Sequence, residues 1–199
     1  MIRMNKFFLA TKNAHKVEEF RRMVGKLGIE VLCETDLDHP LEEVEETGTT
    51  FEENALIKAR AAVKETGLVC IADDSGLCVD ALSGEPGVYS ARYAGAHGDD
   101  AANRKKLLDK MKNVPEEERT AHFSCAIACV FPDGREFTVE GKSEGKIAFE
   151  EKGTGGFGYD SLFLSPVGRF SEITGAQKDA VSHRGAALKL FCDRIQKEI

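Results

Sequence analysis

Two hydrophobic patterns alternate along this chain, and together they predict an α/β protein. Apolar runs, some strictly alternating with polar residues, predict strands, and apolar residues at helical spacing predict helices between them. The predicted strands cover residues 6–10, 29–33, 67–72, 122–131 and 136–141, and the predicted helices cover residues 17–27, 51–66, 99–111 and 186–195. Pro132 to Arg135 supplies a turn signal, so residues 122–141 read as an antiparallel hairpin.

One apolar run ends in chemistry-bearing residues. The strand predicted over residues 67–72 stops at Asp73-Asp74-Ser75-Gly76. Acids at the carboxyl end of a buried strand are a common way to hold a metal ion or a general base. Because neighbouring strand residues point to opposite faces, only one of the two acids can face a given pocket, and the other needs a different partner. The alternative is a plain turn, since all four residues favour turns.

A polar loop joins the first strand to the first helix. The sequence Thr11-Lys12-Asn13-Ala14-His15-Lys16 precedes apolar residues at helical spacing. A helix start presents unpaired N–H groups and the positive end of the helix dipole, which suits a phosphate group, and Lys12 and Lys16 add charge. The alternative is an ordinary helix start capped by Thr11 or Asn13, because no glycine-rich P-loop is present.

An acidic stretch lies between the second strand and the second helix. Residues 36–48 include Glu42, Glu43, Glu45 and Glu46, which reads as a solvated loop that could deliver a further carboxylate to a metal. Thr49 and Thr50 lie three residues before Glu52 and Glu53, a capping-box pattern that predicts where the next helix begins. Within that helix Asn54 and Lys58 share a face, and Lys58 is most simply solvent-exposed.

The last informative stretches are a glycine-rich loop and a basic helix start. Four glycines in Gly153–Gly158 allow close approach of the backbone to a ligand, and Phe157 and Tyr159 could stack on a flat ring. A flexible loop anchored by its aromatic residues is the alternative. Further on, Lys178 and the sequence Ser182-His183-Arg184 precede the final helix, where they read as donors to a ligand or as a cap with surface charge.

Composition limits the partners and the compartment. The 199 residues carry a net charge of −7, which argues against duplex DNA or an anionic membrane as the main partner. Six cysteines without a C-x-x-C pair favour buried free thiols in a reducing compartment, so we expect a cytoplasmic protein.

Six ordered motifs resemble one enzyme family. They are Thr11-x-Asn13-x-x-Lys16, Phe51-x-Glu53-Asn54-Ala55, Ala72-Asp73-Asp74-Ser75-Gly76-Leu77, Pro86-Gly87-x-x-Ser90-Ala91-Arg92, Thr154-Gly155-Gly156-Phe157-Gly158-Tyr159-Asp160 and Ser182-His183-Arg184. In this order they are similar to the inosine/xanthosine triphosphate pyrophosphatases, the Ham1-like or RdgB-like enzymes. Two positions depart from the pattern. Lys12 stands where many members carry glycine, and Ser161 stands where many members carry a proline after the Tyr-Asp pair.

The resemblance implies a fold and a reaction. The fold is an elongated, two-lobed α/β structure with a long mixed β-sheet flanked by helices and an active-site cleft between the lobes. We therefore expect residues 1–199 to form a single catalytic domain, usually as a homodimer. The reaction is hydrolysis of a deaminated purine nucleoside triphosphate, such as ITP, dITP or XTP, to the monophosphate and pyrophosphate.

The resemblance also implies residue roles. Asp74 would hold Mg²⁺ together with Glu45 or Glu46 and act on the attacking water. Substrate binding would fall to Thr11, Lys12, Asn13, Ala14, His15, Lys16 and Lys58 near the phosphates, to Phe157, Gly158, Tyr159, Asp160, Lys178, His183 and Arg184 near the base, and to Ser75.

Three other functions compete with this one. A Maf-like pyrophosphatase acting on another nucleotide is disfavoured by Phe157, His183 and Arg184, which suit a purine. A non-catalytic nucleotide sensor is disfavoured by the intact Asp74 and its acidic companions. A nucleic-acid binder is disfavoured by the acidic net charge.

Overall fold

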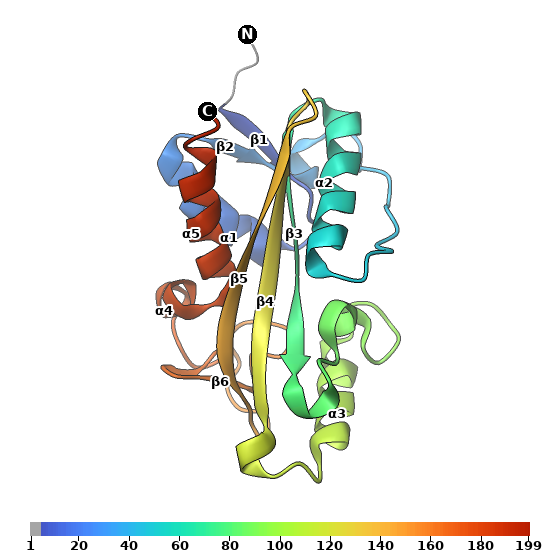
Figure 1. Ribbon diagram of the computed structural model, residues 1–199, viewed down its shortest axis with the longest axis vertical. Coiled ribbons are helices and arrows are strands. Elements are labelled where there is room, and N and C mark those ends of the chain that lie inside the picture. Colours follow the sequence, from blue (N-terminus) through green and yellow to red (C-terminus); the bar gives the residue numbers. More distant parts are fainter. Residues whose placement is uncertain (1–4) are drawn as a thin grey trace. The chain divides into compact units, whose positions relative to one another are not determined.

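A seven-stranded mixed sheet runs through the computed structural model, which describes residues 5–199 (Figure 1). Its strand order is β2-β1-β3-β4-β5-β6-β7. β1 is parallel to β2 and β3, whereas β6 is antiparallel to β5 and β7, so the predicted mixed sheet is confirmed. The strands are β1 (Lys6–Leu9), β2 (Glu30–Leu32), β3 (Val69–Val79), β4 (Thr120–Val130), β5 (Glu136–Ile147), β6 (Phe163–Ser165) and β7 (Gly168–Arg169).

Five α-helices flank the strands, and four were predicted from the sequence. They are α1 (Ala14–Val24), α2 (Phe51–Thr66), α3 (Asp100–Met111), α4 (Gly175–Val181) and α5 (His183–Ile195). α2 begins as predicted, because Thr50 and Glu53 form the reciprocal capping box, and it ends at Gly67 in the left-handed conformation. No helix within residues 5–199 combines the length and apolarity needed to span a membrane.

The chain divides into two compact units, which are described separately. Unit 1 comprises the chain up to Asp74 together with Cys125–Gly141 and Ala187–Ile199. Unit 2 comprises Ser75–Ser124 and Lys142–Ala186.

Unit 1 has a sheet with a helical layer on each face (Figure 1). On one face Val69 and Ile71 of β3 join the cluster that includes Phe20 of α1 and Phe191 of α5. On the other face Cys70 and Ala72 meet the small side chains of α2, which are Ala55, Ala59 and Ala62. Alternate residues of β3 therefore face different helices, as the pleat of a strand requires.

Unit 2 has its own aromatic core. Leu107 and Met111 of α3 pack with Leu77 of β3 and Phe123 of β4. The rings of Phe123, Phe163 and Phe170 lie with centroids 4.7 to 6.0 Å apart. This core anchors the end of the glycine-rich loop, because Tyr159 is buried within it.

The predicted end of β3 was wrong. The strand does not stop at Asp73-Asp74 but continues through Ser75 and Gly76 to Val79. Pairing with neighbouring strands outweighs the turn preference of these four residues, since strand formation depends more on context than on intrinsic propensity. The two acids thus lie within a strand and not at its tip.

Candidate active site

The two successive acids of β3 each meet a lysine from a different helix. Asp73 Oδ2 lies 2.9 Å from Nζ of Lys16, on α1, and the Asp73 side chain is fully buried. Asp74 Oδ1 lies 3.8 Å from Nζ of Lys58, on α2. The expectation that the two acids need different partners is confirmed, because they point to the opposite faces that α1 and α2 cover.

Asp74 lies in a small charged cluster inside unit 1. Its Oδ2 accepts a hydrogen bond of 3.1 Å from Nδ2 of Asn54, which is buried one turn before Lys58 on α2. Burial raises the pKa of the Asp74 carboxyl above its ordinary value, and Lys58 and Asn54 partly oppose this rise. A carboxylate with a raised pKa is better suited to accept a proton near neutral pH than an ordinary exposed aspartate.

Lys58 is not the solvent-exposed residue that spacing alone suggested. Its side chain is only 20% exposed, and its Nζ also lies 3.4 Å from Oε1 of Glu46. Lys58 therefore lies between two carboxylates, those of Asp74 and Glu46. Carboxylates that share one cation in this way have the donor chemistry that a divalent ion also uses.

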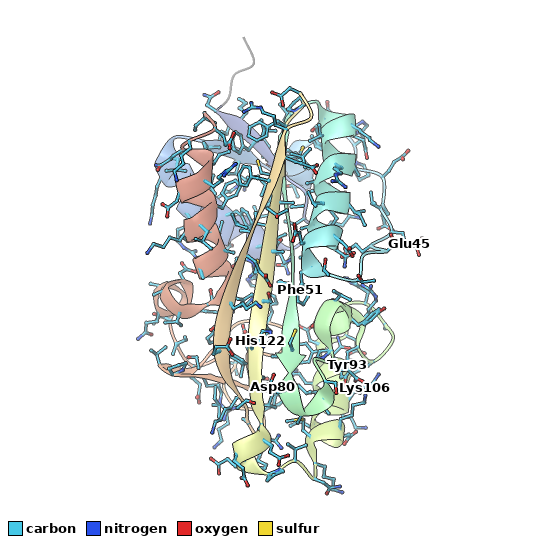
Figure 2. The ribbon with its side chains drawn as sticks, viewed as in Figure 1. Glu45, Phe51, Asp80, Tyr93, Lys106 and His122 are labelled. Carbon is cyan, nitrogen blue, oxygen red and sulfur yellow. The ribbon has the colours of Figure 1, made fainter. Side chains whose placement is uncertain are left out.

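The sequence left open whether Glu45 or Glu46 joins Asp74. Glu46 is half-buried and its charge contributes to the raised pKa of Asp74. Glu45 is exposed, and Figure 2 shows it on the outer side of the loop that precedes α2. Within residues 5–199 no group of three or more His, Cys, Asp or Glu side chains is arranged to hold a metal ion. Asp74 and Glu46 still fit Mg²⁺, which commonly binds one or two carboxylates and completes its shell with substrate phosphates and water.

The predicted phosphate loop is an ordered helix start. Asn13 is the N-cap of α1, and its Oδ1 accepts from the backbone N–H groups of His15 and Lys16 at 3.0 and 3.3 Å. Thr11 Oγ1 in turn accepts from the Asn13 N–H. Ala14 and His15 are exposed at the first turn, and Lys16 is directed to Asp73. The loop therefore presents the positive end of α1 with one lysine fixed beside it.

Lys12, one of the two departures from the family pattern, has an electrostatic partner. Its Nζ lies 2.9 Å from Glu43 of the acidic loop and 4.0 Å from Glu34. The hydrogen bond to Glu43 raises the pKa of Lys12. This lysine thus links the loop after β1 to the loop before α2. Both side chains of the Lys12–Glu43 ion pair are exposed, so solvent screens their attraction.

In unit 2 the carboxylate of Asp160 closes the glycine-rich loop. Its Oδ2 accepts from the Phe157 N–H at 3.0 Å and from Nζ of Lys178 at 2.5 Å. Gly156 has a φ of +72°, and a Cβ there would collide with the Asp160 carboxylate, so only glycine fits. The Lys178 ammonium also lies 5.1 Å from the centre of the Phe157 ring. The half-buried Phe157 ring is therefore held next to a cation carried by α4.

His183 and Arg184 are the first two residues of α5, and Arg184 lies near Phe157 of the glycine-rich loop. The His183 ring stacks on Phe123 with a centroid distance of 4.7 Å. Arg184 is 2% exposed, donates from Nη2 to Ser75 Oγ at 3.0 Å, and places its guanidinium 5.9 Å from the Phe157 ring. The structure thus brings together five of the residues that were predicted to bind the substrate, which are Ser75, Phe157, Asp160, Lys178 and Arg184.

Four contributing residues were not assigned from the sequence. Asn54 and Asp73 hold Asp74 and Lys16 in unit 1. Asp100 and Arg104 of α3 contact the glycine-rich loop in unit 2. The shared face of Asn54 and Lys58 and the alternation of the two acids were the available signals, whereas nothing in the sequence joined α3 to residue 158.

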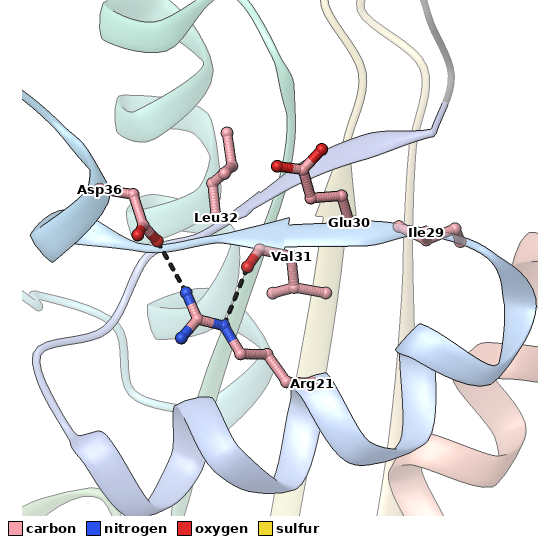
Figure 3. A pocket seen from close by; sticks show the side chains of 6 residues that line it. All are labelled: Arg21, Ile29, Glu30, Val31, Leu32 and Asp36. Carbon is pink, nitrogen blue, oxygen red and sulfur yellow. Dashed lines mark hydrogen bonds and ion pairs between the residues drawn. The ribbon is translucent and has the colours of Figure 1, made fainter.

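A surface pocket beside β2 does not belong to this chemistry. It has a volume of about 300 Å³ and is lined by residues of α1, of β2 and of the segments on either side of β2, which are Arg21, Ile29, Glu30, Val31, Leu32 and Asp36 (Figure 3). Arg21 bonds to one carbonyl of this edge strand, because it donates to Val31 O at 3.1 Å, and it also pairs with Asp36 at 2.7 Å. The arginine thereby protects a free sheet edge from pairing with another strand.

Comparisons with known proteins show the family to which this sequence is similar. The model of the Ham1 family matches residues 7–194. A protein of Exiguobacterium sibiricum named dITP/XTP pyrophosphatase is 52% identical over 186 residues, which are 92% of this chain and 93% of that protein.

Two solved structures have the same fold over nearly their whole length. A HAM1 protein from Coxiella burnetii superposes with a TM-score of 0.88 at 38% identity, covering 99% of this chain and 100% of the other. A nucleoside-triphosphatase, also titled dITP/XTP pyrophosphatase, from Mycobacterium abscessus gives a TM-score of 0.77 at 50% identity, covering 94% and 98%. With its motifs, its fold and its sequence in agreement, this chain belongs to the Ham1 family.

Proposed function

We propose that this protein hydrolyses deaminated purine nucleoside triphosphates, namely ITP, dITP, XTP and dXTP, to the monophosphate and pyrophosphate. The observation that carries the proposal is the buried Asp74 carboxylate with its raised pKa, next to Glu46 and Lys58, in a Ham1-family chain. Relatives that are 52% and 47% identical in sequence are named dITP/XTP pyrophosphatases, which supports the proposed substrate class. We further propose, from family resemblance, that the whole chain acts as one catalytic domain in a cytoplasmic homodimer.

Asp74 and Glu46 are the proposed Mg²⁺ ligands, and Asp74 is the proposed base. Bound Mg²⁺ would neutralise phosphate charge and polarise the bond that breaks. Asp74 would orient the attacking water and take up its proton, a role for which its raised pKa suits it. Asn54, by donating to Oδ2, fixes the rotation of the carboxylate.

Phosphate binding falls to the start of α1 and two lysines. Lys16 carries an ammonium that Asp73 holds in place, and Lys58 carries a second one from α2. Thr11, Lys12, Asn13, Ala14 and His15 would line the phosphate site at the positive end of the α1 dipole. Fixed positive groups stabilise the charge that builds up as the anhydride bond breaks.

The base is recognised in unit 2 by stacking and by donors. Phe157 would stack on the purine, with Gly158, Tyr159 and Asp160 shaping its loop. Lys178, His183 and Arg184 can all donate to the 6-oxygen of hypoxanthine or xanthine, while the 6-amino group of adenine would leave such donors unpaired. Because unpaired buried polar groups are costly, a site of this kind should reject ATP by ~10²- to 10⁴-fold.

The test is pyrophosphate release from a panel of triphosphates with and without Mg²⁺. We expect Mg²⁺-dependent hydrolysis of ITP and XTP that exceeds hydrolysis of ATP, CTP and UTP. Preference for a pyrimidine nucleotide would contradict the purine site, and nucleotide binding without hydrolysis would identify a sensor instead.

A matched pair of variants tests the metal ligand. Losing a ligand should cost at least the ~10-fold in metal affinity that losing an outer-shell partner costs. Glu46→Gln should therefore raise the Mn²⁺ dissociation constant of the free protein, measured by electron paramagnetic resonance, while the exposed Glu45→Gln leaves it unchanged. The reverse ranking would assign the ligand to Glu45.

A further inference from the structure

Helix α3 holds the glycine-rich loop by both polar groups of one residue. Oδ2 of Asp100 accepts from the Gly158 N–H at 2.8 Å, and Nη1 of Arg104 donates to the Gly158 carbonyl at 2.9 Å. Asp100 and Arg104 lie one turn apart on α3, so both face the loop from the same side of the helix. Both bonds are made by charged groups, which are the stronger kind of hydrogen bond.

The residue that α3 holds lies directly beside the stacking ring. Gly158 follows Phe157 and has a φ of +61°, a conformation in which the backbone turns sharply. On its other side, Tyr159 donates from its hydroxyl to Ser90 O at 2.8 Å and is buried. The orientation of the Phe157 ring therefore depends on where the Gly158 backbone is fixed.

Arg104 also joins the two flanks of the loop. Its Nε lies 2.8 Å from Oε2 of Glu151, and the same carboxylate oxygen accepts from Ser161 Oγ at 3.2 Å. Glu151 precedes the loop and Ser161 follows it. One guanidinium thus contacts the middle of the loop and, through Glu151, its two ends.

We propose that Asp100 and Arg104 are positioning residues for the purine, which set the stacking loop in its binding conformation before the nucleotide arrives. This rests on the proposed function of the loop as the base site. Neither side chain touches the reacting phosphates in this assignment. Their contribution is to order the loop in the free protein, because a loop that is already ordered loses less conformational entropy when a ligand binds.

The expected consequence is a loss of nucleotide affinity without a loss of chemistry. Removing a hydrogen bond to a charged group, or the order that it maintains, should weaken binding by ~10-fold. Asp100→Ala and Arg104→Ala should therefore each raise KM for ITP by about that factor. Their kcat should stay within about twofold of the parent value, since uniform binding is what they remove.

A single tryptophan makes the loop directly observable. The chain contains no tryptophan, so Phe157→Trp gives a lone indole at the stacking position. IMP, the expected product, should quench its fluorescence in the otherwise unchanged protein. In this background Asp100→Ala and Arg104→Ala should raise the IMP concentration at half-quenching by ~10-fold, while inhibition by inorganic pyrophosphate stays unchanged.

Two neighbours on α3 serve as matched controls. Asp99 is the N-cap of α3 and accepts from the Ala102 N–H, so Asp99→Ala should lower the melting temperature without shifting the IMP titration. Lys105→Ala alters an exposed side chain on the same helix and should change neither. Asp100→Asn keeps an acceptor oxygen for Gly158 and should recover most of the IMP affinity.

The outcomes separate this inference from the function on which it rests. Absence of IMP quenching in the Phe157→Trp parent would overturn the base site, and the inference with it. Normal quenching at the same IMP concentration in the Asp100→Ala and Arg104→Ala variants would overturn the inference alone. An equal shift in Asp99→Ala would also overturn it, because general weakening of α3 would then explain the loss.

Discussion

The charged cluster of unit 1 and the loop of unit 2 are built in different ways. In unit 1 the two successive acids lie on β3 and their lysines lie on helices, so regular structure fixes these four charges. In unit 2 the aromatic ring and its neighbours lie on a loop that side chains hold through backbone groups. Sites on helices and strands are positioned more exactly than sites on loops. We infer from this difference that the reaction uses groups fixed on strands and helices, and that selection among bases uses a loop that side chains hold in place.

We expect the effect of a substitution on different nucleotides to depend on the unit in which it lies. Changes in the unit 1 cluster should affect every nucleotide by the same factor, since all triphosphates carry the same phosphates. Changes in unit 2 should affect nucleotides according to their base.

Asp74→Asn should produce the largest loss. The amide keeps the shape and can still accept from Asn54, but it can neither take up a proton nor contribute a negative charge. Turnover of ITP and XTP should fall by ~10²-fold or more, measured as initial rates at saturating Mg²⁺. Near-normal turnover would remove Asp74 from the proposed role and direct attention to Asp73.

Lys16→Ala should weaken hydrolysis of ITP and XTP by a similar factor. Losing a cation that stabilises the transition state should cost a few kcal/mol, and the buried Asp73 would also lose the ammonium that lies 2.9 Å from its Oδ2. The ratio of kcat/KM for the two substrates is the decisive measurement, because partial unfolding cancels in it. A loss confined to one base would place Lys16 in the base pocket.

Arg184→Ala should narrow the preference for ITP over ATP. The guanidinium is buried beside Phe157 and bonded to Ser75, and with ITP it would donate to the 6-oxygen. Losing one charged donor should reduce ITP hydrolysis by ~10-fold or more while the residual ATP hydrolysis changes little. If both activities fall equally, Arg184 acts on the phosphates or on folding.

The smallest effect concerns stability and pH. Because burial raises the Asp74 pKa, the native protein binds this proton more tightly than the unfolded chain does. The free energy of unfolding should therefore fall as pH rises from about 4 through the raised native pKa. Asp74→Asn lacks this dependence and should be more stable than the parent at pH 7 but not at low pH.

Urea unfolding in EDTA between pH 4 and pH 7 checks this prediction without interference from a metal. Asp109→Asn, an exposed acid on α3, controls for the change in net charge. If the parent protein were more stable than Asp74→Asn at pH 7, the predicted sign of the effect would be wrong.

Much of the fold followed from local signals in the sequence. Thr50 and Glu53 predicted the start of α2, and the alternation of Asp73 and Asp74 predicted two different partners. Each of these depends on contacts within a few residues or on the fixed geometry of a strand. The six motifs then identified the family through residues that no single local rule explains.

The missed features depend on contacts between distant segments. The continuation of β3 beyond Asp74 depends on pairing with neighbouring strands, and the local preference of Asp-Asp-Ser-Gly for a turn gave the opposite answer. The choice of Glu46 over Glu45 depends on how an irregular loop turns. The bonds from Asp100 and Arg104 to Gly158 span more than 50 positions, and in the sequence both residues resemble ordinary surface charges on a helix.

The alternating partners of β3 have a consequence for how this protein tolerates changes in length. A shift of one residue along a strand moves every side chain to the opposite face. Deleting a single residue between Val69 and Ala72 would turn Asp74 towards Lys16 and Asp73 towards Lys58, even if the strand formed normally. Insertions and deletions should therefore be excluded from this strand. They should be accepted more readily at the Pro132–Arg135 turn, where one extra residue does not exchange the faces of the catalytic side chains.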